Sequence, residues 1–309
     1  MKKNNHVFGP VPSRRLGRSL GIDLVPFKTC SYDCIYCQLG KTTDKTINRK
    51  EYVPVKSILE EITGKLQAPP WPEYITLSGS GEPTLYCELY SLIKEIKYLT
   101  KIPVAVLTNG SLLWDKDIQR GVRCADLVIP SLDAGNENEF QCVNKPHHTL
   151  TFQKMITGLI DFRQCYTGVL WLEVFLLEGI TSLDGSVEKI AAYADKINPD
   201  KIQLNTVARP PAEDFASAVA KEKINTLSRM FGDKAEVIAD YNNIHNSDTF
   251  SVSREEVFTL LKRRPCSLGD IASGLSIHRN EAVKHIQHLI NQGVITTYKI
   301  DNTVFYKTK

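Results

Sequence analysis

The strongest constraint on the fold is an alternation of short β-branched runs with amphipathic helical patterns over the first 240 residues. Such alternation is typical of βαβ units, in which helices join parallel strands. About six units over this length predict an α/β fold, a partial (β/α)6 barrel of the TIM type. Strands are expected at 21–27, 74–78, 103–107, 126–131, 169–177, 201–206 and 235–238, and helices at 55–66, 88–99, 115–122, 149–163, 186–197 and 212–230.

A second, smaller domain is expected after the barrel. The apolar periodicity lapses at 241–252, which predicts a linker between domains at 1–240 and 253–309. In the second domain three helical patterns precede two strand patterns, and this order resembles the winged helix-turn-helix family. The helices are expected at 254–263, 267–275 and 276–291, and the strands at 294–300 and 303–307.

The charge of this second domain indicates what it could bind. It carries nine cations and five anions, a modest excess that suits phosphate contacts. A recognition helix would present Ser276, His278, Arg279 and Asn280 at its leading end, where base edges are read. A module that docks another protein, without touching nucleic acid, is the alternative.

Three cysteines stand close together in the segment KTCSYDCIYCQLG, residues 28–40. Four thiolates would fill every position of a structural zinc site or of an electron-transfer [4Fe–4S] cluster. Three thiolates, from Cys30, Cys34 and Cys37, leave one iron of such a cluster open to another ligand. Zinc with a distant fourth ligand is the alternative that the spacing leaves open.

The C-x3-C-x2-C spacing, with Tyr36 before the third cysteine, resembles the radical S-adenosylmethionine (SAM) superfamily. The resemblance implies one [4Fe–4S] cluster on Cys30, Cys34 and Cys37, whose open iron chelates SAM. It further implies that one electron splits SAM into methionine and a 5′-deoxyadenosyl radical, which takes a hydrogen atom from the substrate. An electron donor such as flavodoxin or ferredoxin is then expected as a partner.

Polar turns follow the next predicted strands, at the strand ends where α/β folds bind ligands. The turn Gly79-Ser80-Gly81-Glu82 resembles the superfamily's Gly-Gly-Glu-like motif, which binds the methionyl amino group of SAM. Thr108 and Asn109 end the next strand, and Ser131 and Asp133 follow the one after it. Similar turns in the family contact the ribose hydroxyls and the carboxylate of SAM.

Several further polar residues are weaker candidates. Glu173 interrupts an apolar strand, and its buried carboxylate would bind the cofactor or a barrel arginine, or form a structural ion pair. Asn205 and Arg209 would line the rim. Lys28 and Lys41 flank the cysteines and are the candidates for contact with the substrate.

Three segments resemble one branch of the superfamily, related to 4-demethylwyosine synthase, which rebuilds a guanine in tRNA. They are 9–21 (GPVPSRRLGRSLG), 144–147 and 205–211. That enzyme has an extra cysteine set for a second cluster, whereas this chain has no cysteine before Cys30. One cluster is therefore expected. The other cysteines, Cys87, Cys124, Cys142, Cys165 and Cys266, show no local ligand spacing.

Charge and hydropathy favour an anionic substrate and a cytoplasmic location. Residues 1–50 contain ten cations and three anions, which suits nucleic acid, although a solvated surface explains them equally well. No signal peptide or membrane-spanning run is apparent, and no membrane partner is expected.

The sequence thus predicts a radical SAM enzyme of oxidoreductase or lyase type. A tRNA or other RNA base is one candidate substrate, beside a small molecule or a protein side chain. The alternative from another class is a DNA-binding regulator that uses its iron–sulfur cluster as a redox switch and does not cleave SAM.

Overall fold

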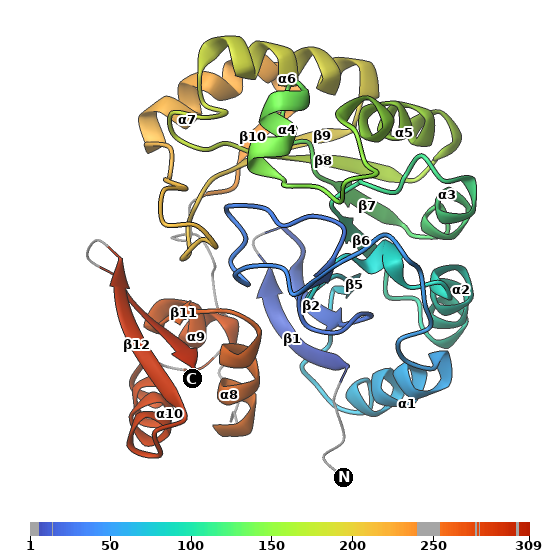
Figure 1. Cartoon of the computed structure of the whole chain (residues 1–309). Coiled ribbons are helices and arrows are strands. Elements are labelled where there is room, and N and C mark those ends of the chain that lie inside the picture. The colour runs from blue at the N-terminus through green and yellow to red at the C-terminus, as the bar shows by residue number, and fades with distance from the viewer. Residues whose placement is uncertain (1–5, 14, 240–253, 276, 278, 301–302) are drawn as a thin grey trace.

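The computed structural model describes residues 6–13, 15–239, 254–275, 277, 279–300 and 303–309. In its described residues up to 239, the strands are β1 (Val7–Ser13), β2 (Gly17–Ile22), β3 (Thr29–Cys30), β4 (Asp44–Lys45), β5 (Tyr74–Leu77), β6 (Val104–Thr108), β7 (Leu127–Pro130), β8 (Val169–Phe175), β9 (Lys201–Asn205) and β10 (Ala235–Val237). Eight of them form one sheet in the order β1-β2-β5-β6-β7-β8-β9-β10 (Figure 1). Only β1 and β2 pair antiparallel in this sheet, which confirms an α/β fold with a mostly parallel sheet.

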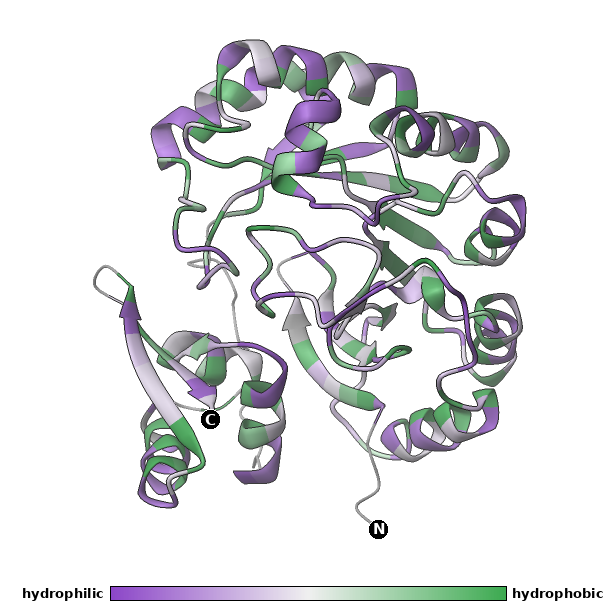
Figure 2. Ribbon diagram, viewed as in Figure 1, coloured by the Kyte–Doolittle hydropathy of each residue, from purple (hydrophilic) through white to green (hydrophobic). Residues whose placement is uncertain are grey.

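Helices cover the outer side of the curved sheet (Figure 1). They are α1 (Val55–Lys65), α2 (Leu89–Leu99), α3 (Lys116–Val122), α4 (Glu137–Val143), α5 (Phe152–Cys165), α6 (Asp184–Ile197) and α7 (Lys221–Ser228), with 3-10 turns at Pro83–Leu85 and Arg229–Lys234. Helix α1 is amphipathic: its buried residues, Ile58 and Ile62, lie one turn apart on the face that packs on the sheet. In Figure 2 the ribbon of β7 is largely green, that is apolar, and all four of its residues are buried.

Two predicted elements differ from the structure. The strand expected at 21–27 ends at Ile22, since Pro26 lacks an amide donor and Lys28 has a positive φ of 61°. The helix expected at 212–230 is α7 alone, followed by a 3-10 turn. Its first residues form a loop because their backbone bonds elsewhere: the Glu213 amide donates to the Ile35 carbonyl. Strand β1 and helix α4 were not expected from the sequence pattern.

A separate C-terminal unit, residues 254–309, follows the barrel. It contains α8 (Arg254–Arg263), β11 (Cys266–Ser267), α9 (Leu268–Gly274), α10 (Arg279–Asn291), β12 (Ile295–Ile300) and β13 (Thr303–Thr308). Its sheet has the order β11-β13-β12, and its apolar cluster, built around residues such as Leu260, Ile271 and Ile286, is separate from that of the barrel. The predicted linker at 241–252 lies outside the described residues, as do Ser276, His278 and the side chain of Asn280.

The C-terminal unit turns two of its helices toward the barrel. In Figure 1, α8 and α9 lie beside β1, whereas α10 and β12 lie on the far side. Nowhere in the described ranges is a helix both long and apolar enough to cross a membrane.

The separate core of the C-terminal unit gives a first prediction. Ile271 is fully buried in it, so Ile271→Ala should lower the free energy of unfolding of this unit by about 2–5 kcal/mol. Hydrogen exchange should then accelerate at backbone amides of α8, α9 and β13, while amides of β5 to β8 keep the wild-type rates. Equal acceleration in the barrel strands would show that the two cores unfold as one.

Candidate functional site

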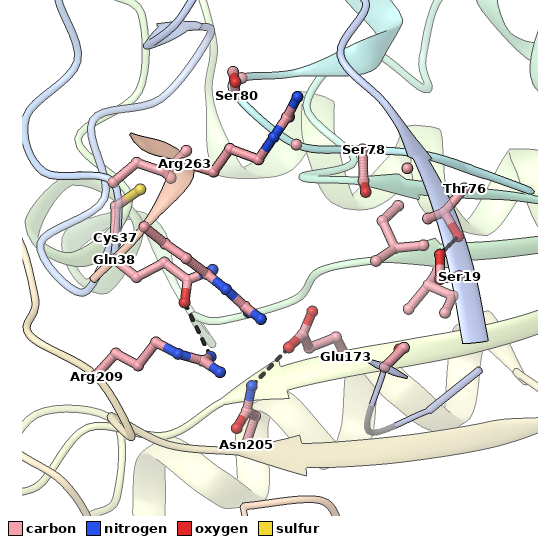
Figure 3. Close-up of a pocket in the computed structure, with 18 of the residues that line it drawn as sticks. Ser19, Cys37, Gln38, Thr76, Ser78, Ser80, Glu173, Asn205, Arg209 and Arg263 are labelled. Atoms are coloured by element: carbon pink, nitrogen blue, oxygen red, sulfur yellow. Dashed lines mark hydrogen bonds between the residues drawn. The ribbon is translucent and has the colours of Figure 1, made fainter. Parts of the chain in front are cut away.

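A cavity of about 460 Å³ lies inside the curved sheet, at the carboxyl ends of its parallel strands (Figure 3). Most predicted site residues meet there, which is the arrangement expected of such sheets. Those that line it are Lys28, Cys30, Cys34, Tyr36, Cys37, Gly79, Ser80, Gly81, Glu82, Thr108, Asn109, Ser131, Glu173, Asn205 and Arg209. Asp133 and Lys41 are not among the lining residues.

Each of the three cysteine sulfurs faces one nitrogen donor. Hydrogen bonds to sulfur stabilise the thiolate and adjust the potential of a bound cluster. The bonds run from Asn109 Nδ2 to Cys30 Sγ (3.5 Å), from Asn144 Nδ2 to Cys34 Sγ (3.5 Å) and from Lys28 Nζ to Cys37 Sγ (3.2 Å).

In the absence of a bound metal, burial favours the protonated thiols, whereas these nitrogen donors favour the thiolates. Burial raises the pKa of the Cys30 thiol to about 12 and that of Cys34 well above its ordinary value. Coordination to a metal deprotonates such thiols outright. Among the described residues, no group of three His, Cys, Asp or Glu side chains is placed to hold a single metal ion. A cubane cluster makes a different demand, since each thiolate binds a different iron. Three sulfurs with cationic and amide donors on one cavity wall fit that group.

The glycine-rich turn after β5 packs directly against the cysteine loop. The Glu82 amide donates to the Thr29 carbonyl at 3.1 Å, and a Cβ on Gly81 would collide with that same oxygen. Gly79 has a φ of +130°, which a residue with a side chain rarely adopts. Glycine at both positions therefore lets the turn approach the loop that carries the cysteines.

The Glu82 carboxylate holds the turns after β5 and β6 together. It accepts from the Thr84 amide and hydroxyl (3.0 and 2.6 Å), from the Thr108 hydroxyl (2.5 Å) and from the Asn109 amide (2.7 Å). Burial raises the pKa of Glu82, and these donors lower it. The contact of Glu82 with the amino group of SAM stays a prediction. The structure shows in addition that Glu82 joins the turns after β5 and β6.

Asp133 lies behind Tyr36. Its carboxylate accepts from the Tyr36 hydroxyl (2.5 Å), the Asn144 side-chain amide (2.9 Å) and the Phe175 amide (3.1 Å). The Tyr36 ring stacks on Phe175 with centroids 4.0 Å apart. Asp133 thus orients both Tyr36 and the amide that reaches the Cys34 sulfur, rather than facing the cavity itself.

Glu173 and Arg209 are both engaged by other side chains. Two nitrogens of Arg15 bind the Glu173 carboxylate at 2.6 and 3.0 Å, and Asn205 donates to it at 2.9 Å. This is the ion pair with a barrel arginine that was one of the expectations for Glu173. Figure 3 shows Arg209 pointing toward Gln38, whose side-chain oxygen lies 3.1 Å from Nη1 of Arg209.

The two lysine candidates for contact with the substrate lie in different environments. Lys28 is buried and reaches a sulfur, whereas Lys41 has an exposed side chain that pairs with Glu213 at 3.5 Å. Asn144, Asp23 and Arg263 had no predicted role, and the structure places them at or beside the cavity. For Asn144 the sequence offered one signal, because residue 144 begins a segment that resembles the branch of 4-demethylwyosine synthase.

Asp133 supports a prediction on pH. Burial raises the pKa of its carboxyl from 3.8 to about 6, so the folded chain binds the extra proton between these values. The free energy of unfolding must therefore fall as pH rises through this window, by about 3 kcal/mol in total. Urea unfolding of the metal-free protein at pH 4 and 7 should show most of this loss as a difference between the two profiles, with the wild type losing more stability than Asp133→Asn, because other groups titrate alike in both. Parallel profiles would contradict the assignment.

Comparisons with known proteins show the family to which the chain belongs. The family model described as the Radical SAM superfamily matches residues 24–194, more than half of the chain. The chain is 35% identical to a UPF0026 protein of Methanocaldococcus jannaschii, over 97% of this chain and 94% of that protein. It is 38% identical to a Brachyspira hyodysenteriae protein named GTPase Obg, but spans only 45% of that protein's length.

Solved structures share the fold at low sequence identity. A radical SAM methyltransferase from Sphaerobacter thermophilus matches with a TM-score of 0.51 and 17% identity, over 71% of this chain and 66% of that one. SuiB of Streptococcus suis, solved with S-adenosylmethionine, matches with a TM-score of 0.52 and 13% identity, over 77% and 56%. Because the family model matches more than half of its residues, the chain belongs to the radical SAM superfamily, whose members use a [4Fe–4S] cluster and SAM.

Proposed function

We propose that this protein cleaves SAM reductively at a single [4Fe–4S] cluster held by Cys30, Cys34 and Cys37, and abstracts a hydrogen atom from an RNA base. The observation that carries the SAM chemistry is the set of three sulfurs, each with its own nitrogen donor, in one cavity with the turn 79–82. This arrangement leaves the fourth iron of a cluster for the amino acid moiety of SAM.

A reduced [4Fe–4S] cluster held by the three cysteines would supply one electron to the sulfonium of SAM, and the available chemistry would be cleavage of the C5′–S bond with transfer of a substrate hydrogen atom to C5′. A reduced flavodoxin or ferredoxin is the proposed source of that electron. The residues of this chain bind and orient. Lys28 and the amides of Asn109 and Asn144 face the sulfurs, while Thr108, Asn109 and Ser131 offer polar groups to SAM. Asp133 acts through Tyr36.

The C-terminal unit supports the choice of an RNA substrate. We take its three helices and its β12–β13 pair as a winged helix-turn-helix. Arg279 and Lys284 on α10 and Lys299 and Lys307 on the strands are exposed. Because α8 and α9 face the barrel and α10 faces away (Figure 1), these cations can meet phosphates while the unit stays docked. The resemblance to the branch of 4-demethylwyosine synthase favours a tRNA base.

The cluster assignment predicts a clear difference between two cysteine variants. Cys37→Ala should remove one of three cluster ligands, so anaerobic reconstitution should yield little iron, and dithionite with SAM should yield no 5′-deoxyadenosine above background. Cys142→Ala is the matched control, since Cys142 is exposed and outside the cavity.

The assay for 5′-deoxyadenosine, combined with a DNA-binding measurement, tests the alternative function. A wild-type protein that binds DNA tightly only with its cluster, and forms no 5′-deoxyadenosine, would be a redox-sensing regulator instead of an enzyme. Formation of 5′-deoxyadenosine that requires all three cysteines excludes that alternative.

The nucleic-acid proposal predicts an effect of charge reversal on α10. Lys284→Glu should weaken binding to bulk tRNA and reduce the slope of log K against log salt by about one, because one phosphate contact is lost. Fluorescence anisotropy over a salt series measures both. Lys56→Glu on α1, equally exposed, controls for net charge. Equal affinities of the two variants would show that α10 does not contact RNA.

A further inference from the structure

The C-terminal unit supplies one wall of the cofactor cavity. Residues of α8, of the turn after it and of α9 line the cavity, namely Leu260, Arg263, Arg264, Asp270, Ser273 and Gly274. Two ion pairs join this wall to the barrel: Arg263 with Asp23, just after β2, and Asp270 with Arg209, in the loop after β9. The wall is therefore fixed on both sides of the cavity.

The first ion pair leads directly to the glycine-rich turn. One oxygen of Asp23 binds Arg263, and the other accepts from the Ser80 amide (2.9 Å) and the Ser80 hydroxyl (3.0 Å). A Cβ on Gly79 would collide with Asp23, so the turn rests on this carboxylate. The Arg263 guanidinium also covers the Phe8 ring of β1 at 3.5 Å.

The second ion pair leads to the cysteine loop. Arg209 donates through Nη2 to Asp270 and through Nη1 to Gln38, both at 3.1 Å. Gln38 follows Cys37 directly. The side chains of Arg209 and Asp270 are 4% and 7% exposed, so separation of the units would leave both charges without this partner. Asp270 also closes the capping box that begins α9, which fixes its orientation.

We propose that the docked C-terminal unit completes the SAM site, with Asp23 and Arg209 as positioning residues that transmit its docking to the turn 79–82 and to the cysteine loop. The inference rests on the assignment of these two segments to SAM and to the cluster. Linkage is reciprocal, so docking strengthens SAM binding and SAM strengthens docking by the same factor. Arg263 and Asp270 thus act on SAM affinity through Asp23 and Arg209.

The test compares SAM affinity in full-length, anaerobically reconstituted variants. Without reductant, equilibrium dialysis should show the Kd for SAM raised at least about fivefold in Arg263→Ala and in Asp270→Asn. Arg263→Lys should restore part of the affinity, because it keeps the charge beside Asp23. Lys262→Ala is the matched control on α8, since Lys262 is exposed and outside the cavity lining. Iron content per chain shows whether each variant still holds its cluster.

A second measurement needs no variant. Hydrogen exchange at backbone amides of α8 and α9 should slow when SAM is added to the wild-type protein, and less so in Arg263→Ala. Unchanged Kd values, or exchange in α8 and α9 that is indifferent to SAM while the turn 79–82 is protected, would overturn the proposal. Failure of SAM to bind the wild type at all would instead overturn the assigned function.

Discussion

The buried carboxylate of Glu82 is the interaction on which the site depends. Its side chain is 2% exposed, and burial without partners would favour the neutral form. Donors from Thr84, Thr108 and Asn109 compensate in part for the lost solvent and fix the turns after β5 and β6 relative to each other. Asn109 in turn donates to the Cys30 sulfur, so one carboxylate connects the glycine-rich turn to the cysteine loop.

Local patterns predicted the parts of the site that are contiguous in sequence. Cysteine spacing predicted three thiols that line one cavity, and polar residues at strand ends predicted the turns beside them, because parallel strands bring their carboxyl ends to one edge. The fold class followed from the same periodicity. Strand β1 was not predicted, because its sequence VFGPVPS contains two prolines and a glycine, which ordinarily argue against a strand.

The remainder of the site depends on contacts between distant residues. Asp23 and Arg263 are separated by 240 positions, and Arg209 and Asp270 by 61. Charged residues in loops and at helix ends carry no period, so neither pair could be read from the sequence. The cavity wall formed by α8 and α9 was missed for this reason, whereas the helices themselves were expected where they occur. Asp133 was expected in the site but acts from behind Tyr36.

The wall contributed by the C-terminal unit has a consequence for the shape of the cavity. A cavity of about 460 Å³ is the size of a site for one small ligand, and it is bounded by the barrel and by this unit together. The two buried ion pairs hold this wall in place, so any movement of the C-terminal unit against the barrel changes the space that a bound ligand can occupy.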